Sequence, residues 1–238
     1  MKLDRVLMLA AHTARSQAYL QALTRHELQP EQVVLFGEKS NAAPVLPASV
    51  TSWQGITLHD PAETLEQTCR KAGWTTMCRA SGDVNAPEIA AVIRAASPDL
   101  VIYSGYGGQI VGESLLASGP RFLHVHSGWL PDYRGSTTLY YTLLNGEQPG
   151  VSALILDRAI DTGPIVARRH YPVPPVGMDL DRFFDHAIRA DLLVRVLETY
   201  ARKGGFDEVE PQNGRDGANY YVIHPVLKHL ALLSLDAY

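Results

Sequence analysis

The sequence predicts an α/β fold: a mostly parallel, twisted sheet with helices on both faces and a small C-terminal appendage. Three observations support this prediction. Short apolar runs recur along the chain, as in residues 5–11 and 100–103, and such runs are typical of buried parallel strands. Helical segments separate them, and residues 5–36 form a complete strand–helix–strand unit. Polar residues follow several of the runs, where ligands bind in sheets of this class.

The N-terminal half alternates strands and helices. Thr13 or Ser16 is expected to cap the first helix, whose apolar positions recur at helical spacing. Asn85, followed by Ala-Pro-Glu, predicts the start of a helix that runs to about Ala96. Residues 40–55 are rich in Ala, Pro and Ser, so we interpret them as an irregular surface connection. The other elements expected in this half are a helix at 63–71 and strands at 5–11, 32–36, 74–79 and 100–103.

The C-terminal half continues the pattern. A long helix is expected at 179–203, because its apolar positions keep the 3.6-residue period and two glycines end it. Residues 164–168 are predicted to lie antiparallel to a neighbouring strand. The other elements expected in this half are a helix at 137–144, strands at 122–125, 151–156, 164–168 and 220–224, a polar loop at 207–218 and a closing element at 225–235.

Length, charge and cysteine content narrow the possible functions. The 238 residues allow one sizeable core. We expect a main α/β domain at 1–203 and an extension at 204–238 that forms the interface of a homodimer. A net charge of −4 gives no help in binding nucleic acid, so no nucleic-acid partner is expected. The two cysteines and the lack of a signal peptide indicate the cytoplasm, and no apolar run is long enough to predict a membrane partner.

Residues 122–163 contain most of the residues that suggest chemistry. His124 and His126 stand at the end of an apolar run, and Asp161 lies in an Asp-Thr-Gly turn. In a strand, residues i and i+2 share a face, so both rings are expected to point into one pocket together with Asp161. Asp is also a common turn residue, and His-x-His with a carboxylate is a set of metal ligands. The pattern indicates an enzyme, with a metal-dependent hydrolase as one alternative.

This segment resembles the formyltransferase family that uses 10-formyltetrahydrofolate. Members include glycinamide ribonucleotide transformylase, the catalytic domain of methionyl-tRNA formyltransferase and the sugar N-formyltransferases. Their active sites read Asn-x-His, then Leu-Pro-x-(Tyr/Trp)-Arg-Gly, then Asp-(Thr/Ser/Gly)-Gly. His126, Leu130-Pro-Asp-Tyr-Arg-Gly135 and Asp161-Thr-Gly163 match these motifs in order, and the likeness extends upstream through residues 98–111.

The resemblance implies a Rossmann-like formyltransferase fold, 10-formyltetrahydrofolate as the co-substrate, and catalysis without a metal. It assigns stabilisation of the oxyanion at the formyl oxygen to His124 and His126, and proton transfer to Asp161. Arg134 is expected to hold its loop. The residues that the resemblance assigns to the folate site are Tyr106, Gly108, Gln109, Ile110 and Val111 from one loop, and Asp157 and Ile160 from another.

His124 departs from the family pattern, because it stands where the family has its catalytic Asn. An imidazole also supplies an N–H, but it is bulkier than an amide and its charge depends on pH. Loss of one oxyanion donor lowers a rate by ~10²–10³. Formyl transfer is therefore the leading hypothesis. Hydrolysis of formyltetrahydrofolate, another acyl or carbamoyl transfer, and folate binding without turnover remain alternatives.

The formyl acceptor is expected to be a primary amine of a small molecule, such as an amino sugar or an amino-acid-derived metabolite. His12, Arg15 and Tyr133 are candidate contacts for it, since a helix N-terminus after the first strand can receive an anion. Methionyl-tRNA is not expected, because the chain is short for an added tRNA-binding domain and its net charge is negative.

Overall fold

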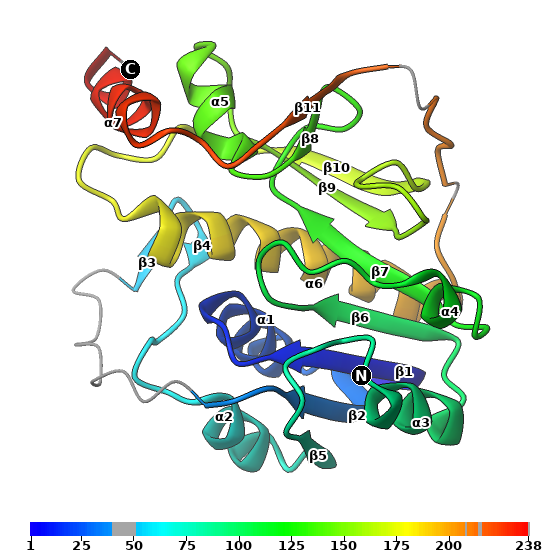
Figure 1. Ribbon diagram of the computed structural model, residues 1–238. Coiled ribbons are helices and arrows are strands. Elements are labelled where there is room, and N and C mark those ends of the chain that lie inside the picture. The colour runs from blue at the N-terminus through cyan, green and yellow to red at the C-terminus, as the bar shows by residue number, and fades with distance from the viewer. Residues whose placement is uncertain (40–50, 208, 214–215, 238) are drawn as a thin grey trace.

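The computed structural model describes residues 1–39, 51–207, 209–213 and 216–237. Its main sheet has seven strands in the order β10-β9-β7-β6-β1-β2-β5 (Figure 1). Neighbouring strands from β7 to β5 are parallel, and β9 is antiparallel to both of its neighbours. The strands are β1 (Lys2–Ala11), β2 (Gln29–Phe36), β5 (Thr76–Arg79), β6 (Leu100–Ser104), β7 (Arg121–His126), β9 (Gly150–Ile155) and β10 (Ile165–His170). The predicted mostly parallel sheet is confirmed.

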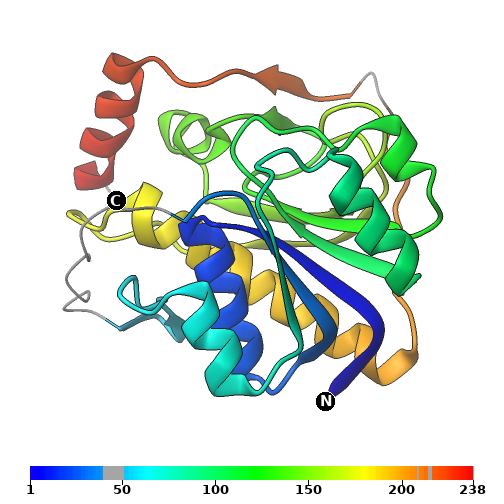
Figure 2. The same cartoon turned by 60° about the horizontal axis from the view of Figure 1, so that its bottom comes forward.

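Helices cover both faces of this sheet, as predicted. Helices α1 (Ala14–Arg25), α2 (Leu65–Ala72) and α6 (Asp185–Lys203) share one apolar cluster with the strand residues that face them. Helices α3 (Pro87–Ala96) and α4 (Glu113–Leu116) share the second cluster, on the opposite face. Figure 2 shows α1 and α6 lying against each other on one side of the sheet. None of the helices in the described residues is both long and apolar enough to span a bilayer.

Two predicted helix starts have different outcomes. Thr13 caps α1, and its hydroxyl accepts from the Ser16 N–H at 3.2 Å. The prediction that Asn85 caps α3 is wrong, because the N-cap of this helix is the next residue, Ala86. The Asn85 amide instead donates to the Ile110 carbonyl at 2.9 Å and accepts from the Gly112 N–H at 2.6 Å. Asn85 therefore ties the 106–111 loop to the start of α3, a role that local sequence does not reveal.

The predicted connection at 40–55 falls partly outside the described residues, which resume at 51. There the chain forms a short hairpin, β3 (Ser52–Trp53) with β4 (Ile56–Thr57). The helix at 137–144 is present as α5 (Thr138–Leu144), and the closing element contains α7 (Pro225–Leu233). A π-helical turn, Leu180–Phe184, precedes α6.

A second, two-stranded sheet attaches the C-terminal extension to the main domain. Strand β8 (Tyr133–Gly135) pairs in parallel with β11 (Ala218–Tyr220), and α7 packs on α5 (Figure 1). The strand predicted at 220–224 is therefore wrong. Pairing ends at Tyr220, and the apolar side chains of Tyr221 and Val222 are exposed by 81% and 76%. Their apolar character is typical of a buried strand, but within the described residues no other segment covers these two side chains.

Gly135 is required at the end of β8. Its φ is +98°, and a Cβ there would lie 2.1 Å from the Tyr220 carbonyl oxygen. We expect Gly135→Ala to lower the free energy of unfolding by roughly 1–3 kcal/mol, because Ala is strained in this backbone conformation and displaces β11. Urea denaturation measures the change. Gly205→Ala is the matched control, since a Cβ there meets no atom within 4 Å. Equal destabilisation by the two substitutions would contradict this assignment.

Candidate active site

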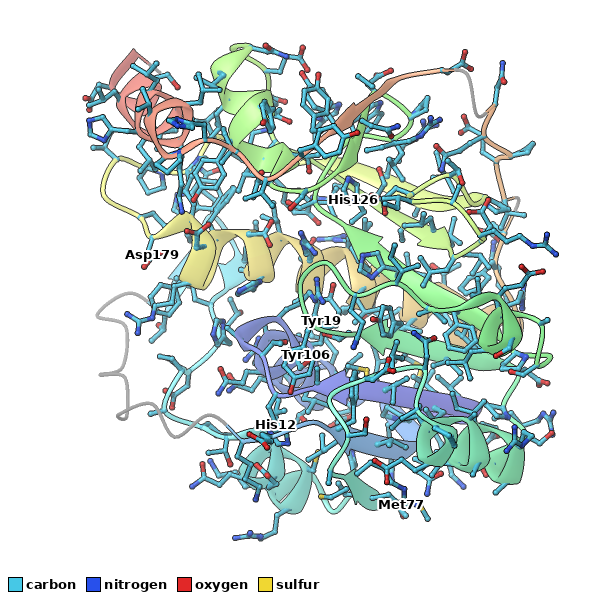
Figure 3. All side chains as sticks on the ribbon, in the orientation of Figure 1. His12, Tyr19, Met77, Tyr106, His126 and Asp179 are labelled. Atoms are coloured by element: carbon cyan, nitrogen blue, oxygen red, sulfur yellow. The ribbon has the colours of Figure 1, made fainter. Side chains whose placement is uncertain are left out.

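Strand β7 carries both histidines to one face of the sheet. Leu123 and Val125 face the α1 and α6 side, whereas Phe122 faces the α3 side. Because side chains alternate along a strand, His124 and His126 share the face of Phe122. Figure 3 shows His126 at the end of this strand, above Tyr106 and well apart from His12.

His126 lies between two oxygen acceptors. Its side chain is buried, with Nε2 at 2.7 Å from the Tyr133 carbonyl oxygen and Nδ1 at 3.4 Å from Oδ2 of Asp161. A carbonyl and an ionised carboxylate only accept hydrogen bonds. The ring is therefore held between two acceptors, with one nitrogen facing each of them.

Asp161 is a buried carboxylate that its neighbours keep ionised. Burial alone would raise its pKa, but His126, His124 and the N–H of Gly135 outweigh it, so the pKa lies below its ordinary value. The Gly135 N–H donates to Oδ2 at 2.9 Å. The backbone φ of Asp161 is +55°, in the left-handed region, which Asp tolerates better than most residues. The carboxylate is thus available as a proton acceptor at neutral pH.

The turn that presents Asp161 depends on close backbone packing. A Cβ at Gly163 would lie 1.8 Å from the Ile155 carbonyl oxygen, so only glycine fits there. Asp157 stabilises the same turn by accepting from the Ala159 N–H at 3.1 Å and the Thr162 hydroxyl at 2.7 Å. Asp161 follows the antiparallel strand β9, and the β9–β10 connection returns it to His126.

His124 is half-buried and neutral. Its Nδ1 lies 3.4 Å from the Tyr103 carbonyl oxygen of strand β6. Burial, with Arg15 and Arg189, lowers the pKa of His124 to about 3, while Asp161 acts in the opposite direction. At neutral pH the ring therefore carries a single proton.

Two arginines flank this region, and sequence reasoning identified only Arg15. Its guanidinium donates to Ser104 Oγ at 3.3 Å and to the Gly105 carbonyl. This places Arg15 at the carboxyl end of β6, one residue beyond the carbonyl that faces His124. Of the candidate acceptor contacts, Arg15 is therefore the one that the fold brings to the histidines.

Arg189 and Asp185 on α6 were missed. Arg189 Nε lies 3.0 Å from Asp185 Oδ2, and Nη1 donates to the Val125 carbonyl at 3.4 Å. Burial would raise the pKa of Asp185, but Arg189 and His186 hold it well below its usual range. The available signal was an acid and a base four residues apart on the buried side of a helix. An acid–base pair of this kind is usually exposed to solvent, so the spacing alone did not indicate that this pair lies near the site.

The first predicted folate loop is anchored by three of its residues. The Tyr106 ring packs edge-on against Phe36 at 5.8 Å, and Val111 is buried. Gln109 donates to the Gly82 carbonyl at 2.7 Å. Gly108, with φ of +75°, and Ile110, 56% exposed, remain open to solvent.

The second predicted loop is linked to the helix that follows the first. Arg158 in this loop pairs with Glu113, at the start of α4, at 2.6 Å. Ile160 is 54% exposed. Each predicted folate loop thus leaves one large apolar side chain open, Ile110 in the first and Ile160 in the second, and Ile160 directly precedes buried Asp161.

Two other candidate contacts lie elsewhere. His12 is near Glu66 and Lys39, which act on its pKa in opposite directions, while burial lowers it. The Tyr133 side chain is buried: its hydroxyl accepts from Asn145 at 2.7 Å, and its ring stacks on Tyr220 at 5.2 Å. Tyr133 thus supports His126 through its carbonyl and has no open side chain for a substrate.

Arg134 is buried, and its guanidinium donates to the Asn213 carbonyl at 3.2 Å. Its position between the β8 loop and the C-terminal extension matches the predicted holding role. Across the described ranges, no three His, Cys, Asp or Glu side chains are grouped as ligands for a metal ion. The alternative of a metal-dependent hydrolase therefore has no ligand cluster to support it in these ranges.

The fold and this site together define an α/β enzyme that combines a buried carboxylate with two imidazoles for acid–base chemistry. The family comparison identifies the class. Residues 5–186 match the model of the family described as formyl transferase, so the chain belongs to this family. The predicted family, fold and enzyme class, with 10-formyltetrahydrofolate as the family's formyl donor, are confirmed.

Known proteins agree with this assignment. A methionyl-tRNA formyltransferase from Roseiflexus sp. (strain RS-1) is 36% identical over 121 residues, which cover 49% of this chain and 36% of that protein. The chain thus spans little more than a third of this relative. Glycinamide ribonucleotide transformylase 1 from Symbiobacterium toebii has a TM-score of 0.60 at 18% identity, with 89% of this chain and 96% of that chain covered. HypX from Aquifex aeolicus, in complex with tetrahydrofolic acid, has a TM-score of 0.55 at 18% identity, with 94% and 30% covered.

These relatives correct one prediction. The exclusion of nucleic acid in favour of a small-molecule acceptor is wrong, because curated relatives are methionyl-tRNA formyltransferases. The prediction relied on a net charge of −4. That value averages over the whole chain, whereas an acceptor is held by local groups, so it excludes nothing.

The low pKa of His124 predicts how stability changes with pH. Below pH 6.5 the unfolded chain protonates this histidine, whereas the folded chain does so only near pH 3. The free energy of unfolding should therefore fall as pH falls from about 6.5 towards 3, by roughly 1 kcal/mol per pH unit from this residue. We expect a shallower decline in His124→Asn, measured by urea denaturation at several pH values. Exposed His229→Asn is the control, and parallel curves for wild type and His124→Asn would refute the prediction.

Proposed function

We propose that the chain transfers the formyl group of 10-formyltetrahydrofolate to a primary amine, with His124, His126 and Asp161 as the catalytic residues. The observation that carries this proposal is the buried contact between His126 and Asp161, at 3.4 Å. In this contact an imidazole ring and a carboxylate that can accept a proton lie next to each other. Formyl transfer needs both, since negative charge develops on oxygen while the attacking nitrogen loses a proton.

The folate is proposed to lie between the 106–111 and 157–161 loops. Gly108 leaves room for a flat ring to approach the backbone. The exposed side chains of Ile110 and Ile160 supply apolar walls that otherwise face water. The solved relative with tetrahydrofolic acid shares this fold, which supports the choice of ligand.

In this arrangement we assign the stabilisation of the oxyanion on the formyl oxygen to His126. Its fixed position between Tyr133 and Asp161 means that little reorganisation is needed during the reaction. Asp161 accepts the proton that the amine nitrogen loses once the new carbon–nitrogen bond forms. The positively charged nitrogen is more acidic than the ammonium form of the free amine, and collapse of the adduct to the amide makes the loss of its proton irreversible.

For the acceptor, we propose the amino group of methionyl-tRNA, because that is the acceptor in the names of the curated relatives. The cationic side chain of Arg15, which acts on His124, gives the site a local positive charge despite the negative net charge of the chain. Phosphate groups near the aminoacylated end of a tRNA are suitable partners for such charge.

Asp161→Asn tests the assignment. Asn keeps the shape and tolerates the left-handed backbone, but it cannot accept the proton. We expect kcat for formylation of methionyl-tRNA to fall by ~10²–10⁴, while calorimetry shows unchanged binding of 5-formyltetrahydrofolate, the unreactive isomer. Asp207→Asn, an exposed carboxylate paired with Lys203, is the matched control. Transfer at the wild-type rate by Asp161→Asn would remove Asp161 from the mechanism.

A further inference from the structure

The position of His124 limits which hydrogen bonds its ring can make. The Tyr103 carbonyl, on the adjacent strand β6, faces Nδ1 at 3.4 Å. A carbonyl oxygen has no proton to give, so this contact is favourable only when Nδ1 carries the hydrogen. The opposite tautomer would set a nitrogen lone pair against the oxygen lone pairs. The geometry therefore favours the Nδ1–H form.

The charges around the ring keep it from taking a second proton. Arg15 on α1 and Arg189 on α6 disfavour a positive ring, as do burial and the neighbouring His126, and Asp161 alone among these groups acts in the opposite direction. The ring therefore has one N–H, which is used on Tyr103. Nε2 is left with a lone pair, and no partner for it is recorded within the described residues.

Asp161 offers a second free acceptor on the same site. Its Oδ2 receives the Gly135 N–H and faces His126. No contact of Oδ1 is recorded in the parts of the chain that the structure describes. His124 and Asp161 each act on the other's pKa, so they belong to one site. That site therefore holds two hydrogen-bond acceptors, His124 Nε2 and Asp161 Oδ1.

A neutral primary amine matches this pair, because it has two N–H donors and one lone pair. We propose that His124 orients the attacking amine by accepting one of its N–H bonds at Nε2, and does not donate to the formyl oxygen. Asp161 accepts the other N–H, so the nitrogen lone pair is free to point at the formyl carbon. This inference rests on the proposed function and assigns His124 a role different from the one that the family resemblance implied.

The reaction balances without a change at His124. The amine lone pair forms the bond to the formyl carbon, and the carbonyl electron pair moves to oxygen. The pair then re-forms the carbonyl as the bond to folate N10 breaks and its electrons go to N10. The amine proton passes to Asp161 and from Asp161 to N10, so the carboxylate is regenerated. The products are the N-formylated amine and tetrahydrofolate, and His124 keeps its single proton throughout.

The tautomer can be measured independently of any activity. In the full chain labelled with 15N-histidine, long-range 1H–15N correlation spectra distinguish a protonated Nδ1 from a protonated Nε2. Among the nine histidines, His124 is identified as the one whose signal disappears in His124→Asn. His124→Gln serves the same purpose should the first variant fail to fold. We expect a protonated Nδ1 and a bare Nε2 from pH 8 to about pH 5. A protonated Nε2, or titration near pH 6.5, would overturn the inference.

Kinetics provide the second test. Loss of a hydrogen bond to the amine by His124→Leu should raise KM for methionyl-tRNA by roughly three- to tenfold, with a smaller change in kcat. Loss of an oxyanion donor would instead lower kcat by ~10²–10³, and that result would contradict the proposed role. Absence of transfer by the wild-type chain would reject the proposed function, while the spectra would still decide the tautomer.

Discussion

The contact between Asp161 and His126 is the interaction on which the site depends. An ionised carboxylate is costly to bury, so it needs opposite charge and hydrogen bonds within the protein. The Gly135 N–H donates one such hydrogen bond to Asp161, and the His126 ring lies against the same carboxylate oxygen. Gly135 belongs to β8, which is held by its pairing with β11 and by the stacking of Tyr133 on Tyr220. The C-terminal extension therefore acts as part of the active-site structure, although it lies outside the segment that matches the family model.

Local patterns in the sequence were sufficient to predict the strands of the parallel sheet and the faces of β7. Alternation places Phe122, His124 and His126 together because a strand has a fixed period of two. Contacts between distant segments could not be predicted in this way. Strand β11 pairs with β8 through backbone atoms, and Asn85 bonds to Ile110 and Gly112 instead of capping its own helix. Neither contact has a signature in local composition.

The same distinction applies to the site. His124, His126 and Asp161 were identifiable from motif and spacing, whereas Arg189 reaches His124 only because α6 packs against the sheet end where β7 terminates. The hydrogen bond of His124 to Tyr103 depends on the pairing of β6 with β7. Residue identity alone suggested an N–H donor to the oxyanion. The neighbouring carbonyl and the two guanidinium groups give the ring the opposite hydrogen-bonding role.

The central claim is that this site moves a formyl group to an amine and does not release it to water. The most direct measurement is the formation of tetrahydrofolate from 10-formyltetrahydrofolate, followed with and without methionyl-tRNA. We expect tetrahydrofolate to appear only when the amine is present, in the same amount as formylmethionyl-tRNA. Tetrahydrofolate and formate produced at the same rate without an acceptor would show that the chain is a hydrolase, and would contradict the claim.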